Sequence, residues 1–174
     1  CALTDNGTIS GAVSFVKAMK DKGIKPILGC ELYLSQDSAT IQDKENRTLS
    51  HLVVLAKNKE GWSDLISIAS RSNDEDVFYF RPRIDLTILE ELNKNQNLIS
   101  FSGHPGSDLA NVLFVNWKKA YNSRSYEEAA KHLKRNWFEE ASMLLSRYIK
   151  IFGKENFYIE IQLIDKENFP AAEL

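Results

Sequence analysis

The sequence predicts an α/β fold built on a mainly parallel sheet or barrel. Apolar runs of strand length alternate with segments whose apolar residues recur at helical spacing. The first three segments are predicted as strand, helix and strand with short connections, which is the order of a βαβ unit. The second predicted strand, KPILGCELYL, is apolar along its whole length, as is typical of parallel strands covered on both faces.

The first βα unit is predicted from the opening residues. The run ALT is a short apolar strand, and DNG after it has turn chemistry because Asn-Gly tolerates a positive φ. Helical spacing predicts a helix over about 8–22, with Gly23 as its C-terminal cap. KPILGCELYL then returns as the second strand.

A polar excursion over 36–50 separates the second strand from the third, HLVVLA. Asn58 can cap the helix that follows, because a side-chain oxygen at this position accepts from free amides of the first turn. Pro82 interrupts the next loop, and Asp85 can cap a short helix that ends near Lys94. The run NLISFSG is the fourth predicted strand.

The last third of the chain is predicted as mainly helical. HPGSDLANVLF is a turn that leads into a helix, and Ser125 with Glu128 forms a capping box. This box is expected to open one long amphipathic helix through Phe152, ended by Gly153, within a helical insertion over 116–152. NFYIEIQLI is the fifth predicted strand.

The composition indicates an ordinary globular protein. At 174 residues the chain is about one domain long, and its apolar fraction of 43% and charged fraction of 26% are typical of soluble domains. The net charge of −2 gives no bulk attraction to nucleic acid, so any such contact would need a local basic patch.

Cysteine usage and hydropathy indicate a cytoplasmic location. Cys1 and Cys30 are the only cysteines, and no Cys or His spacing of a zinc motif is present. Cys30 lies in an apolar strand, where a reduced packing role is expected. No apolar run approaches the roughly 18 residues that span a bilayer, and no secretion signal is present. We expect a soluble protein without membrane contact.

Four polar residues lie at or near the ends of predicted strands, where α/β folds gather functional groups. They are Asn6, Glu31, His51 and His104. Imidazole and carboxylate together suit zinc, manganese or iron. Spacing alone leaves structural roles open: His51 as a hydrogen-bonding residue at a strand border, His104 as a turn residue, and Glu31 as a solvated or ion-paired side chain.

Several strings carry a family resemblance. ALTDNGTISGAVSFVKAMKDKGIKPILGCELYL resembles the start of the PHP domain (polymerase and histidinol phosphatase) of bacterial DNA polymerase III alpha subunits. HLVVLAKNKEGWSDLISIAS, FYFRPRID, NLISFSGHPGSDLA and IFGKENFYIEIQ follow in the family's order, so the resemblance covers nearly the whole chain. It is weakest in the polar excursion and in the segment VNWKKAYNSRSYEEAAKHLKRNW.

The resemblance implies a segment of a distorted (β/α)7 PHP barrel that lacks the first and last strands, so that 1–174 is a single, incomplete domain. In active members a cluster of divalent ions at the strand ends hydrolyses phosphoesters through a metal-bound hydroxide. The family's metal-ligand positions map onto Glu31, His51 and His104 of this sequence. The ion implied for the intact parent polymerase is zinc, manganese or magnesium, whereas this segment alone is expected to bind it weakly or not at all and to be inactive.

One ligand position departs from the family pattern. The family's TDH histidine corresponds to Asn6, whose neutral carbonyl oxygen is a poor ligand for a transition metal beside imidazole. Asp5 could substitute, or could orient the turn by hydrogen bonding. The family also uses an HxH and an Asp-x-His motif, and neither string occurs in this sequence. Either other parts of a longer polymerase supply these ligands, or the site has decayed. Asn6 favours at least partial decay, and we expect a degenerate metal site.

These observations favour a PHP segment of a replicative DNA polymerase alpha subunit, from a bacterium or phage, that acts as a structural module. DNA would be contacted through the parent polymerase, and other replisome subunits are expected partners. An active metal-dependent 3′–5′ exonuclease or pyrophosphatase domain of the same polymerase, or a free-standing phosphoesterase, remain alternatives. In FYFRPRID, Arg81 and Arg83 could contact a phosphate backbone or belong to a packed loop.

Overall fold

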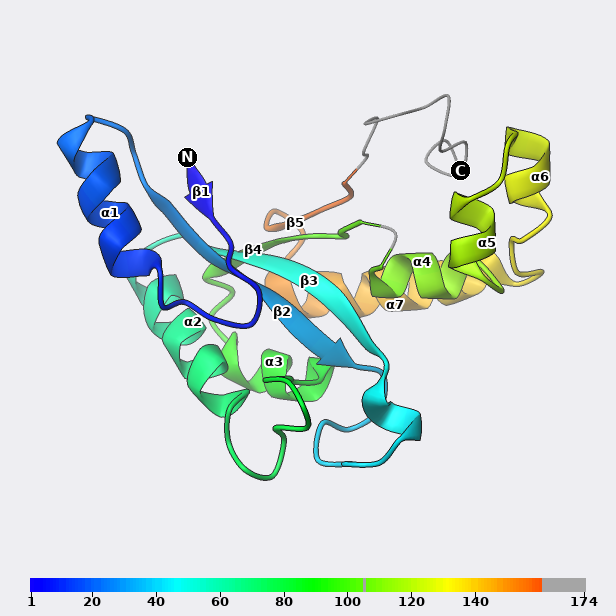
Figure 1. The fold of residues 1–174 in the computed structure, drawn as a ribbon, viewed down its shortest axis with the longest axis horizontal. Helices are drawn as coiled ribbons and strands as arrows, with labels where there is room; N and C mark the ends of the chain where they lie inside the picture. Colours follow the sequence, from blue (N-terminus) through cyan, green and yellow to red (C-terminus); the bar gives the residue numbers. More distant parts are fainter. Residues whose placement is uncertain (105, 161–174) are drawn as a thin grey trace.

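The computed structural model describes residues 1–104 and 106–160 as a five-stranded sheet with helices (Figure 1). The strands are hydrogen-bonded in sequence order, β1-β2-β3-β4-β5. Their bounds are Ala2–Leu3 for β1, Ile27–Ser35 for β2, Leu49–Ala56 for β3, Leu98–Phe101 for β4 and Phe157–Tyr158 for β5. The prediction of a mixed α/β class is confirmed.

The expectation of a mainly parallel sheet is wrong for the centre of the sheet. β1 and β4 are parallel to β2 and β5 respectively, but β3 is antiparallel to both of its neighbours. Parallel neighbours need a crossover connection, usually a helix. The excursion between β2 and β3 contains only the 3₁₀ turn η1, Glu45–Arg47, so the chain folds straight back on itself.

Seven α-helices lie in the described part of the chain. They are α1 at Ala12–Asp21, α2 at Lys59–Arg71, α3 at Leu86–Leu92, α4 at Asp108–Leu113, α5 at Trp117–Tyr121, α6 at Tyr126–Ala130 and α7 at Trp137–Phe152. Two predicted caps are confirmed: Asn58 accepts from the Gly61 amide at 2.8 Å, and Asp85 accepts from two amides at the start of α3, both at 2.9 Å. None of these helices is long and apolar enough to cross a membrane.

The predicted capping box is present, but the long helix that it was expected to open is wrong. Ser125 accepts from the Glu128 amide at 3.2 Å, yet α6 ends at Ala130. The chain then pairs with the segment after α4, because the His132 carbonyl accepts from Val115 at 2.8 Å. These backbone hydrogen bonds replace helical ones, so α7 is a separate helix that starts at Trp137.

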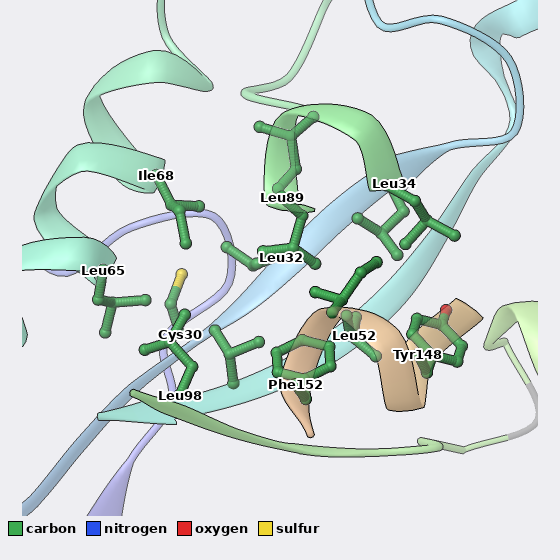
Figure 2. Packing of buried hydrophobic residues seen from close by; sticks show 14 of the residues in the cluster. Cys30, Leu32, Leu34, Leu52, Leu65, Ile68, Leu89, Leu98, Tyr148 and Phe152 are labelled. Carbon is green, nitrogen blue, oxygen red and sulfur yellow. The ribbon is translucent and has the colours of Figure 1, made fainter. Parts of the chain in front are cut away.

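One face of the sheet packs on α2, α3 and α7 to form the core (Figure 2). Side chains alternate along a strand, so every second residue of β2 and β3 faces this core. The core-facing residues of these two strands are Cys30, Leu32, Leu34, Leu52 and Val54. The intervening residues, among them Glu31 and His51, therefore lie on the opposite face of the sheet.

Arg83 attaches the polar excursion to the loop between α2 and α3. Its side chain is fully buried and donates to four backbone carbonyls at 2.7–2.8 Å. The acceptors are the carbonyl oxygens of Ala39, Ile41, Asn46 and Val77. Of the two roles considered for Arg83, the packed-loop role is the one the structure supports.

The fifth strand is only partly described. β5 covers Phe157–Tyr158, whereas the predicted strand extends to residue 164. Residues 161–164 of that prediction lie outside the described residues.

Candidate metal centre

The pairing of β2 with β3 brings Glu31 and His51 together. Tyr33 is directly opposite His51, and Glu31 is directly opposite Val53. Residues opposite each other in an antiparallel pair share a face, so Glu31 and His51 are diagonal neighbours on that face. His104 joins them from the loop after β4, where Gly103 adopts a φ of +83° that glycine tolerates without steric cost.

The three side chains form a compact cluster. The Glu31 Oε1 atom lies 2.5 Å from His51 Nδ1 and 3.7 Å from His104 Nε2, and the two imidazole ring centroids are 5.3 Å apart. The side chains of Glu31, His51 and His104 are 19%, 27% and 41% exposed. The cluster is therefore partly desolvated but open to solvent, as a ligand or ion would require.

Hydrogen bonds orient the two histidines of the cluster. A carboxylate only accepts, so His51 Nδ1 donates to Glu31, while His104 Nε2 lies farther away, at 3.7 Å. The Gly106 amide donates to His104 Nδ1 at 3.0 Å, which assigns the proton of a neutral His104 ring to Nε2. Binding of an ion at Nε2 would require the opposite tautomer of His104 and loss of this contact with Gly106.

The donor set fits a divalent transition metal. One donor atom from each of Glu31, His51 and His104 lies within 4.8 Å of the others. Ligand atoms bonded to one zinc ion at about 2.1 Å are at most about 4.2 Å apart, so coordination needs small side-chain movements together with the change of tautomer at His104. Two imidazoles, one carboxylate and an open fourth position form a ligand set that zinc uses in catalytic sites.

Asn6 lies beside this cluster. It forms an isolated parallel bridge with Glu31, and the flanking backbone is tied to β2 because the Gly7 amide donates to the Glu31 carbonyl at 2.8 Å. Asn6 itself is exposed. The position that the family resemblance assigns to a ligand is therefore next to Glu31, and it carries a neutral amide.

Asp5 and Cys30 lie elsewhere. A methyl group added at Gly11 would come within 2.7 Å of the Asp5 Oδ2 atom, so this carboxylate packs against the start of α1. Cys30 faces the core, and burial raises the pKa of its thiol to about 11. Because metals bind the thiolate, Cys30 does not serve as a ligand despite being adjacent to Glu31 in the sequence.

Sequence reasoning missed Tyr33, and it did not place Arg81 beside this cluster. The Tyr33 ring contacts the edge of the His51 ring, with centroids 5.1 Å apart, and Arg81 Nη1 donates to the Tyr33 hydroxyl at 3.0 Å. The alternation of β2 carries a signal for Tyr33, which is two residues from Glu31. The position of Arg81 depends on a loop that no local pattern predicts.

Comparison with known proteins identifies the family. The pattern of the PHP domain matches residues 1–163. The chain belongs to the PHP domain family. Its relatives include DNA polymerase III subunit alpha from Borreliella burgdorferi, 35% identical over 163 residues, and from Helicobacter pylori, 34% identical over 160 residues. Each alignment covers 92% of this chain and 12% of the relative.

A relative that aligns over a shorter part of this chain has the same name. DNA polymerase III subunit alpha from Chlamydia trachomatis is 43% identical over 95 residues, which is 53% of this chain and 8% of the relative. This PHP domain is thus homologous to part of the polymerase alpha subunits of several bacteria. Its structure brings together Glu31, His51 and His104, the three residues that the resemblance assigned to metal binding.

Proposed function

We propose that this PHP domain is a structural module of a replicative DNA polymerase alpha subunit and that it retains a reduced metal centre. The observation that carries the proposal is the convergence of Glu31, His51 and His104 within 4.8 Å, beside a position occupied by Asn6. The likeness to relatives named DNA polymerase III subunit alpha supports the polymerase context.

The proposed setting is a distorted (β/α)7 barrel of which residues 1–174 form one incomplete domain. In this proposal the segment 116–152 is a helical insertion, and the strands missing from the barrel lie outside this chain. The parent polymerase supplies the contact with DNA and with other replisome subunits in the cytoplasm. The chain spans only 12% of the length of these relatives, which supports the proposal that it belongs to a longer polymerase.

A divalent ion at the centre would act as a Lewis acid toward a phosphoryl oxygen. Glu31 supplies the single negative charge of the ligand set, and His51 and His104 supply neutral donors. A cluster of several ions needs more carboxylates to offset its charge, and Asn6 adds none. The three-residue set therefore suits one weakly held ion better than the multi-ion chemistry of phosphoester hydrolysis.

Metal titration tests the proposal. We expect calorimetry with zinc chloride or manganese chloride to show one weak site, and dialysis to leave less than one ion per chain. Glu31→Gln and His51→Ala should each abolish the binding. His132→Ala is the matched control, because His132 is the histidine outside the cluster.

Two results would contradict the proposal in different ways. A wild-type chain that binds no zinc or manganese has no metal centre at these residues. A chain that holds two or more ions through dialysis and hydrolyses a phosphodiester supports the enzymatic alternative, a metal-dependent exonuclease or pyrophosphatase, instead of a structural module.

A further inference from the structure

Positive charge is concentrated in residues 116–137, which we call the basic insertion. This segment contains six basic and two acidic side chains, a net charge of +4 in a chain whose net charge is −2. The remaining residues therefore carry a net charge of −6. A local field of this kind attracts a polyanion to one part of the surface, although the chain as a whole does not.

Two backbone hydrogen bonds close the basic insertion into a compact unit. The Val115 amide donates to the His132 carbonyl at 2.8 Å, and the Lys134 amide donates to the Leu113 carbonyl at 2.9 Å. Between these bonds α5 packs against α6. Figure 1 shows the two helices projecting at one end of the molecule, away from the sheet. The basic residues near both ends of the insertion therefore belong to one projection.

Four of the six cations have no carboxylate partner. Lys134 forms an ion pair with Glu140 at 2.7 Å, and hydrogen bonding followed by the charge of Lys131 lowers the pKa of Glu127. Within the described part of the chain the other four side chains form no salt bridge, and all four are exposed. These four unpaired cations are Lys118, Lys119, Arg124 and Arg135. Their charges are available to an anionic ligand.

The shape of the insertion favours a duplex over a single strand. Single strands are bound in basic grooves whose aromatic rings stack on successive bases. The pocket between α3, α4 and α7 includes Lys134 but none of the four unpaired cations. Trp137 and Phe138 pack edge to face on each other, with ring centroids 5.6 Å apart, and so do not form a row of parallel stacking surfaces. Duplex DNA presents one phosphate charge per about 1.7 Å of its axis, so cations on a projection reach phosphates without a groove.

The same features disfavour a lipid surface or a protein as the ligand. α5 and α6 are five residues long each, so neither has the extended apolar face with which an amphipathic helix enters a lipid surface. Tight protein contacts centre on anchor residues in well-packed pockets. The four unpaired cations lie on two short helical elements and their connections, which is an arrangement suited to a repeating row of phosphates.

We propose that the basic insertion binds the phosphate backbone of duplex DNA, without base specificity, through its four unpaired cations. This inference rests on the proposed polymerase setting for the identity of the polyanion, because the product of a DNA polymerase is a duplex. It also goes beyond that setting, in which other parts of the parent contact DNA. Lysine supplies a point charge for a phosphate, and arginine can bind a phosphate through two parallel hydrogen bonds.

Salt dependence of duplex binding tests the contact. A short labelled DNA duplex is titrated with the 174-residue chain at several salt concentrations, and fluorescence anisotropy measures the binding. Each phosphate contact contributes about −0.9 to the slope of log K against log salt, so we expect a slope between about −1.8 and −3.6 for two to four contacts. A duplex of different sequence should bind with the same affinity and the same slope.

Charge removal at the insertion should abolish this binding. Changing all four unpaired cations to glutamine should remove the salt-dependent affinity for the duplex, and Arg135→Gln alone should make the slope less negative by about 0.9. Arg135→Lys keeps the charge and should keep the slope. Because the changed side chains are exposed, urea denaturation should show the free energy of unfolding of the wild type.

Charge-matched variants locate the contact. Changing four exposed lysines elsewhere to glutamine removes the same total charge and should leave the slope unchanged. These control positions are Lys44, Lys59, Lys94 and Lys154.

A second basic segment runs from α1 into the turn after it, with Lys17, Lys20, Lys22 and Lys25 beside Asp21. α1 follows β1, which is hydrogen-bonded only to β2 within the described sheet, so the proposed missing strands would cover this end of the molecule. If glutamine at the four α1 lysines abolishes duplex binding and glutamine at the four unpaired cations does not, the inference is wrong.

Three other results would overturn the inference. They are the absence of duplex binding at low salt, tighter binding of a single strand of the same length than of the duplex, and binding of phosphatidylglycerol vesicles without binding of the duplex. Zinc titration remains a separate test of the metal centre. A chain that binds zinc but no duplex keeps the metal centre and loses this contact, whereas a chain that binds the duplex but no zinc keeps this contact and loses the metal centre.

Discussion

The candidate centre depends on the two-residue alternation of β2 and β3. Cys30 and Leu32 point into the core, whereas Glu31, between them, points to the other face of the sheet. A one-residue shift in register would move Glu31 into the core and bring a thiol to the site. The apolar residues of the core therefore fix the position of the acidic one.

The role of position 6 can be tested by restoring the family's histidine. Asn6 lies beside Glu31, so Asn6→His should add a fourth donor to the cluster. We expect zinc to bind more tightly by at least about tenfold, because loss of even an outer-shell partner of a ligand costs 10–100-fold. Calorimetric zinc titration measures the change.

Asn6→Gln is the matched control, since it keeps a neutral amide and should leave zinc affinity near that of the wild type. An Asn6→His chain with unchanged zinc affinity would mean that position 6 does not face the cluster.

At the scale of single residues, the structure supports the grouping of the predicted ligands, and metal binding by them stays a prediction. Glu31, His51 and His104 were predicted as a set through the family resemblance, and they do lie together. Spacing alone left their roles open. The contacts of Tyr33 with His51 and of Arg81 with Tyr33 were not predicted, because they depend on the β2–β3 register and on a loop conformation that many sequences could adopt.

At the level of elements, the polar excursion is held by one buried side chain. Arg83→Met should lower the free energy of unfolding by about 3 kcal/mol or more, because it removes four charge-assisted hydrogen bonds and leaves buried carbonyls unpaired. Arg83→Lys should recover only part of this loss, since lysine lacks the planar fork. Urea denaturation measures the change.

Arg135→Met is the control for loss of a charge at an exposed position, and it should alter the free energy of unfolding by less than about 0.5 kcal/mol. A loss below about 1 kcal/mol for Arg83→Met would show that the excursion is held by other contacts.

Helix starts that depend on a local hydrogen bond were predicted correctly. Strand direction and helix length, which depend on pairing with distant segments, were not. The caps at Asn58 and Asp85 are local hydrogen bonds, and both predictions are confirmed. The direction of β3 depends on which strand it pairs with, and the expected parallel arrangement is wrong. The break between α6 and α7 arises from pairing with residues after α4, which helical periodicity does not reveal.

For the molecule as a whole, Tyr148 links global stability to pH. It is 2% exposed, its hydroxyl donates to Asp108 at 3.1 Å, and burial followed by the Asp108 charge raises its pKa well above the ordinary value. The folded chain therefore keeps a proton that the unfolded chain releases near pH 10. This contribution to stability is complete below that pH and is lost as the pH rises above it.

We expect the free energy of unfolding to fall by up to about 1.4 kcal/mol per pH unit above pH 10 through this residue. Tyr148→Phe should reduce the slope, as measured by urea denaturation at several pH values. Tyr158→Phe, at a half-exposed tyrosine, is the control and should keep the wild-type slope. Equal slopes for wild type and Tyr148→Phe would contradict this assignment.

The Arg83 contacts also bear on how such chains are divided into domains. A polar run without periodicity, such as residues 36–50, has the composition by which inter-domain linkers are recognised. A cut placed there would separate the Arg83 guanidinium from three of the carbonyls that it binds, at Ala39, Ile41 and Asn46, or would leave these carbonyls at a new chain end. The halves on either side of this run are parts of one folding unit, and neither half should be expressed or grafted alone.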